Sequence, residues 1–349
     1  MKRVALSLVL VAGMAASSAM AADMATKAAP AAAPPPSPWD VAISAALMTD
    51  YNFRGITQSA HNASTQAGFE LRYTQSPMWQ YYAGISGESI DFPNHAAAEI
   101  DLYGGVRPTF DKLALDFGIW YYWYPGGNCY GNAAGSVPGT GICKDPEYGG
   151  SVVPIRGNVS PTLGGNVVKS NESFYEWYAK ATYTINDQWS VEGQYYYSPS
   201  VSNTGAPGNY ITGNVTYTEP ASWYPANSGL GGYISGDIGY WDLGTSDVFY
   251  GTGITAVGAI GHVNEFGTPY TSYWNWDAGF GFTYKAFTLD LRYYDTNLSS
   301  SQCNAFTSAS NSSYSTAPTN QNPDGLGSNW CGAAYIAKLS FQANLSGLK

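Results

Sequence analysis

Strict alternation of side-chain type over long stretches is the feature that most limits how this chain can fold. From Val41 to Arg54, apolar and aromatic side chains occupy most odd positions, whereas the even positions include Asp50 and Arg54. Alternate residues of a β-strand point to opposite faces, so this pattern predicts a strand with one apolar and one polar face. Its fourteen residues exceed the roughly 5–6 residues typical of globular strands and suffice for a tilted strand that crosses a bilayer.

The same alternation recurs along the chain and predicts about twelve strands. Beyond the N-terminal region, no uninterrupted apolar run has the length of a membrane-spanning helix, so helical spans are not expected. Segment 210–218 also alternates, but bacterial single-chain barrels have even strand numbers, so we assign it to a hairpin arm or loop outside the membrane. The predicted strands are 41–54, 67–74, 81–88, 99–107, 113–124, 173–184, 188–198, 230–243, 247–261, 270–284, 286–295 and 333–345.

The connections between these strands alternate in length. The short ones are 76–78, 108–112, 185–187, 244–246 and 285, and the long ones are 55–66, 89–98, 125–172, 199–229, 262–269 and 296–332. One rim of tight turns opposite one rim of long loops is typical of outer-membrane barrels, whose short turns face the periplasm. We therefore predict an all-β fold, a transmembrane antiparallel up-and-down β-barrel of about 12 strands with long extracellular loops.

The N-terminal residues are expected to lie outside the barrel. A basic start at Lys2 and Arg3, an apolar stretch and a small-residue cleavage site near Ala21 predict a signal peptide over 1–22. Residues 23–38 are rich in Ala and Pro and predict a disordered leader. Residues 39–349 then form a single barrel domain, which we expect in the outer membrane of a Gram-negative bacterium.

Charge and motif content argue against several functional classes. Removing Lys2 and Arg3 with the signal peptide leaves 13 basic residues against 25 acidic ones, a formal charge of −12, which does not favour nucleic-acid binding. The three histidines fall in predicted loops, and the chain has no P-loop, strand-bound GxGxxG or HExxH motif. We therefore expect no enzyme activity, no cofactor and no metal site.

Tyr and Trp cluster where the predicted strands begin and end. Examples are 121–124, 195–197, Trp274, Trp276 and, just after short turns, Trp79 and Trp189. Such rings are stabilised at headgroup depth because one edge is apolar and the other can hydrogen-bond. We interpret them as aromatic girdles that contact outer-membrane lipid.

The four cysteines fall in two of the predicted extracellular loops. Cys129 and Cys143 share one loop, and Cys303 and Cys331 bracket another. Three pairings are possible, of which 129–143 with 303–331 is the simplest. The spacings are not those of zinc ligands and no histidine lies near, so disulfides are favoured over a metal site.

Several segments resemble those of the TorF-family porins. The run TDYNFRGITQS at 49–59 is similar to the opening SDYRFRGISQS of that family, and EIDLYGG at 99–105 is similar to its ELDLYAG strand. IWYYWYP at 119–125 and YYDTN at 293–297 resemble its YYYYP and YVDTN segments. The resemblance implies an outer-membrane porin without assigned catalytic residues. This chain departs from the family pattern by long insertions at 126–170, 199–229 and 300–331.

Function must then depend on the inward-facing side chains. Acids outnumber bases on the predicted inner face, which favours cations in a water-filled pore. Strand parity predicts these pore-lining residues: Asp50, Arg54, Glu70, Arg72, Glu88, Glu99, Asp101, Arg107, Asp116, Glu176, Lys180, Glu192, Asp237, Asp277, Asp290, Arg292 and Lys338.

The sequence is therefore interpreted as a monomeric or homo-oligomeric (trimeric) channel for passive diffusion of small hydrophilic solutes or ions, with a mild cation preference. Two alternatives stay open. The first is a closed structural or recognition barrel that acts through its long loops, since small barrels are filled by side chains and only larger ones hold an aqueous channel. The second is a soluble secreted β-sandwich.

Overall fold

The computed structural model describes residues 37–127, 130–131, 167–169, 171–247, 267–307, 309, 313–314 and 326–345. From Pro38 onward these residues belong to one compact unit. The predicted signal peptide and most of the predicted leader, 1–36, lie outside the described residues, as do Cys129 and Cys143.

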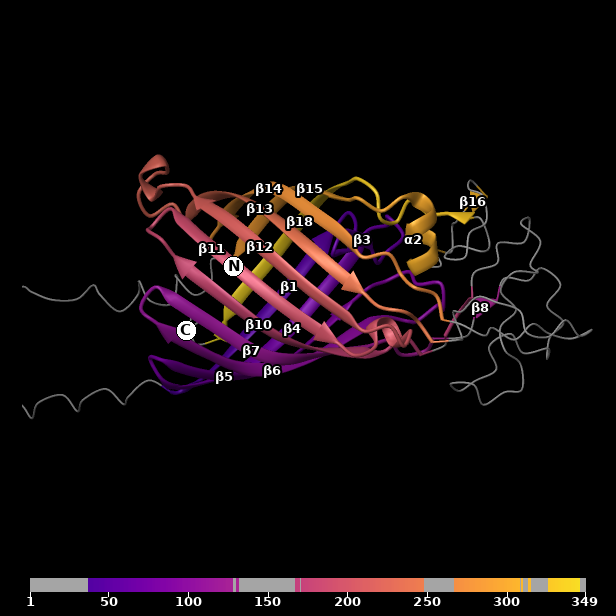
Figure 1. Ribbon diagram of the computed structural model, residues 1–349. Helices are drawn as coiled ribbons and strands as arrows, with labels where there is room; N and C mark the ends of the chain where they lie inside the picture. Colours follow the sequence, from indigo (N-terminus) through magenta and orange to yellow (C-terminus); the bar gives the residue numbers. More distant parts are fainter. Residues whose placement is uncertain are drawn as a thin grey trace, which may run out of the picture. The chain divides into compact units, whose positions relative to one another are not determined.

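Twelve antiparallel strands close into a single barrel (Figure 1), which confirms the predicted fold class. Each strand pairs with its neighbour in sequence, and β18 closes the ring on β1. No helix among the described residues is both long and apolar enough to cross a membrane. The barrel strands are β1 (Trp39–Met48), β4 (Ser64–Ser76), β5 (Trp79–Glu88), β6 (Glu99–Phe110), β7 (Leu113–Trp123), β10 (Phe174–Thr184), β11 (Trp189–Ser198), β12 (Gly208–Thr218), β13 (Leu230–Leu243), β14 (Tyr273–Tyr284), β15 (Phe287–Thr296) and β18 (Ala334–Asn344).

The alternation seen in the sequence decides which face of each strand turns outward. On β5, Tyr81 and Ile85 are 44% and 45% exposed, whereas Tyr82, Ser86 and Glu88 between and beyond them are buried. The outer surface therefore carries apolar and aromatic side chains, and the polar ones face inward, as a barrel wall in lipid requires.

Two strand assignments from the sequence were wrong, although the total of twelve was right. Segment 208–218 is barrel strand β12, paired with β11 and β13, and not a loop outside the membrane. The ring closes without the predicted strand 247–261, because β13 pairs directly with β14; apart from Asp247, that segment lies outside the described residues. Both segments alternate, and only cross-strand pairing decides which one enters the ring.

The predicted strand 41–54 is also shorter than expected. Strand β1 ends at Met48, and the chain then turns into the connection 49–63, which we call L1. L1 contains a small two-stranded sheet, β2 (Asn52–Phe53) and β3 (Ile56–Thr57), whose strands pair only with each other.

The two rims differ in the length of their connections, as predicted, but with two changes. The turn-side connections are 77–78, 111–112, 185–188, 219–229 and 285–286, so one of them is longer than a tight turn and carries the 3₁₀ helix η4 (Ala221–Trp223). Residues 244–246 begin the connection 244–272 and are not a short turn.

The other rim carries L1 and the remaining connections. The connection 297–333, which we call L6, contains α2 (Ser300–Thr307), β16 (Ser313–Tyr314) and β17 (Leu326–Gly327). Figure 1 shows α2, β16 and β8 (Tyr130–Gly131, paired with β9, Val167–Val168) at one end of the barrel. The 3₁₀ helix η3 (Val201–Asn203) lies in the connection 199–207.

Candidate functional site

The tip of L1 is a tight turn whose local sequence explains its shape. The backbone N–H of Gly55 donates to Asn52 Oδ1 at 2.9 Å, an arrangement in which the Asn side chain replaces a backbone turn. Arg54 and Gly55 have φ of 52° and 83°. A Cβ on Gly55 would lie 2.2 Å from Thr296 Cγ2, so only glycine lets this turn approach the wall of the barrel.

This turn enters the barrel and contacts the inner face of the wall. Arg54 donates from both terminal nitrogens to Glu176 on β10, at 2.8 and 2.7 Å. Both side chains are buried, with 5% and 1% of their surface exposed. Tyr273 on β14 donates from its hydroxyl to the Arg54 carbonyl at 3.0 Å. Contacts to β10 and β14 show that L1 extends across the lumen.

Aromatic rings surround the Arg54 guanidinium. Its central carbon lies 4.2 Å from the ring centre of Tyr210, 4.4 Å from that of Trp241 and 4.8 Å from that of Tyr196. Phe53 packs edge-on against Tyr122 and Trp241. Cations are stabilised over ring faces, and desolvation strengthens the effect. The turn therefore forms part of a packed core inside the barrel.

Burial of the inner face changes from one rim to the other. Towards the long-loop rim, inward side chains such as Glu99, Glu176, Trp241 and Tyr273 are at most 2% exposed. Towards the short-turn rim, the side chains of Arg72, Asp116 and Arg107 are 17%, 19% and 26% exposed. The lumen is thus filled on the L1 side and wetter on the turn side.

Two charged networks lie in this wetter half. Arg107 bridges Glu70 at 2.8 Å and Asp116 at 3.2 Å, and Arg72 lies 2.5 Å from Glu70. Separately, Arg292 pairs with Asp277 at 2.5 Å and with Asp290 at 3.0 Å.

Five inward acids have no cationic partner within 4.0 Å among the described residues. Glu192 accepts from Thr182 at 2.6 Å and also from Gln194, and Asp237 accepts from Thr212 at 2.5 Å. Glu88, Glu99 and Asp101 form a cluster in which one carboxylate oxygen of each lies within 4.8 Å of the others. An acid surplus on the inner face therefore remains after pairing.

The structure places most of the predicted pore-lining residues on the inner face of the wall. Lys180 lies over the rings of Tyr178 and Tyr196, and Lys338 donates to Gln66 at 3.3 Å. Arg54 is inside the barrel but on L1, not on a wall strand as predicted. That the inward residues line a conducting pathway stays a prediction.

Asp50 corrects the strand-parity prediction more strongly. It lies on L1 after the end of β1, and its carboxylate accepts from Thr57 at 2.5 Å and from Ser59 at 2.9 Å. Its other oxygen lies 2.8 Å from His61 Nδ1. Asp50 therefore organises L1 internally, because the chain leaves the strand direction before reaching it.

L1 is also attached to L6. The Thr57 backbone N–H donates to the Trp330 carbonyl at 2.9 Å, and His61 Nε2 lies 3.2 Å from the Asn329 carbonyl. The hydrogen bond with Asp50 raises the pKa of His61 above its ordinary value of 6.5. L1 is thus anchored both to the wall and to a second loop.

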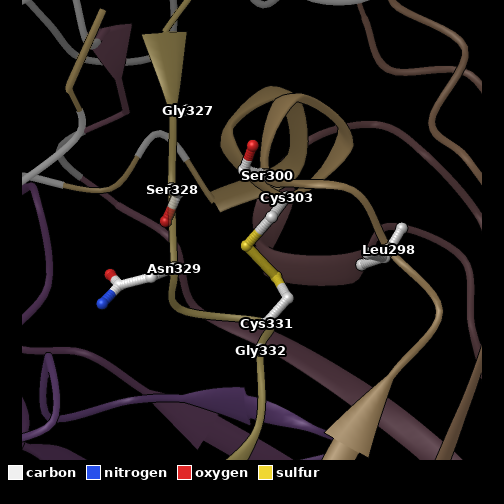
Figure 2. Close-up of a pocket in the computed structure, with 8 residues that line it drawn as sticks. All are labelled: Leu298, Ser300, Cys303, Gly327, Ser328, Asn329, Cys331 and Gly332. Carbon is white, nitrogen blue, oxygen red and sulfur yellow. A yellow bond between two sulfur atoms is a disulfide. The ribbon is translucent and has the colours of Figure 1, made fainter. Parts of the chain in front are cut away.

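The predicted disulfide between Cys303 and Cys331 is present and shapes L6. Figure 2 shows it joining α2 to the segment that follows β17, beside a pocket lined by residues of L6. Those lining residues are Leu298, Ser300, Cys303, Gly327, Ser328, Asn329, Cys331 and Gly332. The pocket belongs to the loop end and not to the lumen networks. The predicted pairing of Cys129 with Cys143 lies outside the described residues.

Aromatic residues inside the barrel were missed by sequence reasoning. Tyr122, Tyr124 and Tyr196 were assigned to girdles, yet Tyr122 and Tyr124 are buried and Tyr196 lies against Arg54 and Lys180. Their odd-numbered neighbours Tyr121 and Tyr195 are exposed on the outer face. Applying the same two-residue parity to the aromatic runs would have separated the two groups.

Comparisons with known proteins give remote similarities. A model of a bacterial protein family of unknown function (Gcw_chp) matches residues 32–145. No curated protein matches the sequence.

Among solved structures, the chain is similar to the NanC porin (8% identity, 86% of this chain and 98% of that chain covered, TM-score 0.36). It is also similar to LpxR from Salmonella typhimurium (7% identity, 86% of this chain and 99% of that chain covered, TM-score 0.37). A third similar structure is a loop L8 deletion mutant of OmpT, an outer membrane protein of Vibrio cholerae (10% identity, 87% of this chain and 98% of that chain covered, TM-score 0.33). No activity is carried over from these proteins, and the resemblance to TorF-family porins stays a prediction.

Proposed function

We propose that the protein is a porin-like channel of the Gram-negative outer membrane that passes small hydrophilic solutes or ions by passive diffusion and is narrowed by L1. The observation that carries the proposal is the division of the lumen. Charged networks remain partly exposed in one half, and the other half is filled by a core to which L1 contributes Phe53, Arg54 and Ile56. Partly exposed charged side chains on the inner face are expected where a barrel encloses water.

L1 is built as a separable part of the lumen. Its strands β2 and β3 pair with each other and do not join the barrel sheet. The contacts that hold it inside are the Arg54–Glu176 pair, the ring contacts of Phe53 and a few hydrogen bonds. Moving L1 away from the wall must break this buried ion pair and the packing of the surrounding rings, so the free energy of these contacts sets how often L1 opens. Conduction then depends on how far L1 moves from the wall.

A mild cation preference follows from the acids without cationic partners. Glu192 and Asp237 lie on β11 and β13 and accept hydrogen bonds from neutral groups, so their charge is not cancelled locally. Acidic groups on the wall of a pore raise the local concentration of cations. The lipid-facing partner is the outer-membrane bilayer itself, and assembly into homo-oligomers such as trimers is compatible with this role.

A closed recognition barrel is the second candidate. It is favoured by the complete burial of Tyr273 and the near-complete burial of Trp241 and Glu176, which lie in the filled half of the lumen. In that case the long loops, and not the lumen, would carry the activity.

Liposome swelling with a size series of sugars separates the two candidates. The channel predicts swelling rates that exceed those of protein-free liposomes and fall as the sugar becomes larger. The reversal potential measured across a planar bilayer under a salt gradient should have the sign expected when cations permeate more readily than anions. Swelling equal to protein-free liposomes would favour the closed barrel, and a reversal potential of opposite sign would remove the cation preference.

A further inference from the structure

Three carboxylates meet on the inner face where β5 ends and β6 begins. Glu88 lies directly opposite Glu99 in the strand register, and Asp101 follows two residues later on the same face. The three residues are 3%, 2% and 4% exposed. Like charges in directly opposed strand positions repel, and burial strengthens the repulsion because it removes water.

The neighbours of this triad offset its charge only in part. Glu99 accepts from the hydroxyls of Tyr51 at 2.5 Å and Tyr124 at 2.9 Å. Glu88 Oε1 accepts from Gln66 at 2.7 Å, and Lys338, which donates to the oxygen of that amide, attracts the Glu88 carboxylate without lying in ion-pair contact with it. None of the three acids lies within ion-pair distance of a basic side chain in the described part of the chain.

One oxygen of Glu88 and one of Asp101 lack a hydrogen bond of normal geometry among the described residues. Glu88 Oε2 and Asp101 Oδ1 are fully buried, and the polar groups beside Asp101 are Ser86, which donates to its other oxygen at 3.3 Å, and the Trp120 ring N–H. A buried polar atom without a partner is costly, and a buried carboxylate oxygen more so. These free oxygens are an observation separate from the clustering, and they indicate that a ligand completes the site.

We propose that Glu88, Glu99 and Asp101 bind a calcium ion. The donor set is all oxygen, which is the preference of hard divalent cations and not of zinc or copper. Oxygens on opposite sides of Ca²⁺ lie about 4.6–5.2 Å apart, and the triad oxygens lie within 4.8 Å of one another. Mg²⁺ requires shorter distances and keeps several waters, which suits this buried position less well.

The calcium site would also hold L1. Tyr51 belongs to L1 and donates to Glu99, one of the proposed ligands. A bound cation would fix the Glu99 carboxylate and therefore the acceptor for Tyr51. The site does not depend on whether the barrel conducts, so it can be tested apart from the channel proposal.

The test uses the full chain, refolded in detergent and stripped of metal with a chelator. Tb³⁺ is a suitable probe because it substitutes for Ca²⁺ and its emission is sensitised by nearby rings such as Tyr51 and Tyr124. We expect saturable Tb³⁺ emission that Ca²⁺ displaces. Glu88→Gln and Asp101→Asn should each weaken binding at least about tenfold, since each removes one charged ligand.

Glu192→Gln is the matched control, because it neutralises an inward acid outside the triad and should leave Tb³⁺ affinity unchanged. Thermal unfolding supplies a second readout that does not need Tb³⁺. Ca²⁺ should raise the unfolding temperature of the wild type but not of Asp101→Asn. In chelator, Asp101→Asn should be more stable than the wild type, because it relieves the repulsion.

Absence of saturable emission from the folded wild type would overturn the proposal, and the triad would then carry shared protons. If Glu192→Gln weakened Tb³⁺ binding as much as the triad variants do, the proposal would also be overturned, because the cation would then be attracted by the negative charge of the lumen in general and not bound by the triad. Heat-modifiable gel migration of each variant establishes that the barrel has formed before either result is read.

Discussion

Arg54 on L1 and Glu176 on β10 form a two-pronged ion pair inside the barrel, with N–O distances of 2.8 and 2.7 Å and both side chains almost fully buried. L1 follows β1, whose neighbour in the ring is β4. Strands β5, β6 and β7 lie between β4 and β10, the strand that carries Glu176. Glu176 is further bound by the Tyr122 hydroxyl at 3.2 Å. This contact holds L1 inside the lumen.

Replacing Arg54 with Ala should release L1. Removal of one partner from a buried pair costs about 3–5 kcal/mol, because the remaining carboxylate has no counter-charge. We expect the amides of Thr57 and Gln58, which are bonded to Trp330 and Tyr51, to exchange hydrogen at least about a hundredfold faster. Arg54→Lys should give an intermediate rate, since lysine cannot form the two-pronged contact.

The control for this measurement is Arg292→Ala. It breaks ion pairs with Asp277 and Asp290 in the other half of the lumen and should leave L1 exchange unchanged. Wild-type exchange rates in Arg54→Ala would show that the ion pair does not hold the loop.

His61 makes the attachment of L1 to L6 dependent on pH. Its two ring nitrogens face two acceptors, the Asp50 carboxylate and the Asn329 carbonyl, so only the protonated ring can donate to both. The pKa of His61 is higher in the folded protein than in the unfolded chain, where it is about 6.5. The stabilisation by the protonated ring is therefore complete below pH 6.5 and is lost as the pH rises through the folded-state pKa. The L1–L6 contact should therefore be stronger in acid.

An NMR titration of the His61 ring checks this expectation. The wild-type midpoint should lie above 6.5, and Asp50→Asn should lower it by removing the charged acceptor. A wild-type midpoint at or below the ordinary value would contradict the assigned contact.

The Cys303–Cys331 disulfide should stabilise L6 and not the barrel. It closes a loop with a sequence separation of 28, for which chain entropy predicts about 3–4 kcal/mol of constraint. A Cys303→Ser, Cys331→Ser double variant should keep heat-modifiable migration but be cut faster by proteinase K within 304–330. Equal cleavage of both proteins would mean that other contacts order this loop.

Neutralising the two unpaired acids in the wetter half should weaken cation preference. A Glu192→Gln, Asp237→Asn variant is expected to lower the cation-to-anion permeability ratio about twofold, because the wall loses uncancelled negative charge. Asp242→Asn is the matched control, since Asp242 is exposed near the rim and pairs with Ser272. An unchanged ratio in the double variant would place selectivity elsewhere.

The wall of the barrel could be predicted from the sequence because its physics is local. The parity that exposes Tyr81 and Ile85 and buries Tyr82 and Glu88 is visible in the order of the residues. The pairing of Cys303 with Cys331 could likewise be proposed from loop membership.

The filling of the lumen could not be predicted in the same way. Alternation continues from β1 into L1, so Arg54 was assigned to the wall, and the Asn52–Gly55 turn signal was the one local indication of a reversal. The choice between 208–218 and 247–261 depended on pairing with β11 and β13, which is a non-local property. The Glu88–Glu99 contact also required the strand register.

Single-channel conductance of a variant with a shortened L1 shows whether L1 narrows a channel through the barrel. In this variant a short Gly-Ser linker replaces residues 52–57, which removes Phe53, Arg54 and the turn between β2 and β3. We expect a larger conductance step and longer openings than in the wild type, with unchanged heat-modifiable migration. If the folded variant conducts no better than the wild type, L1 does not narrow a channel through this barrel.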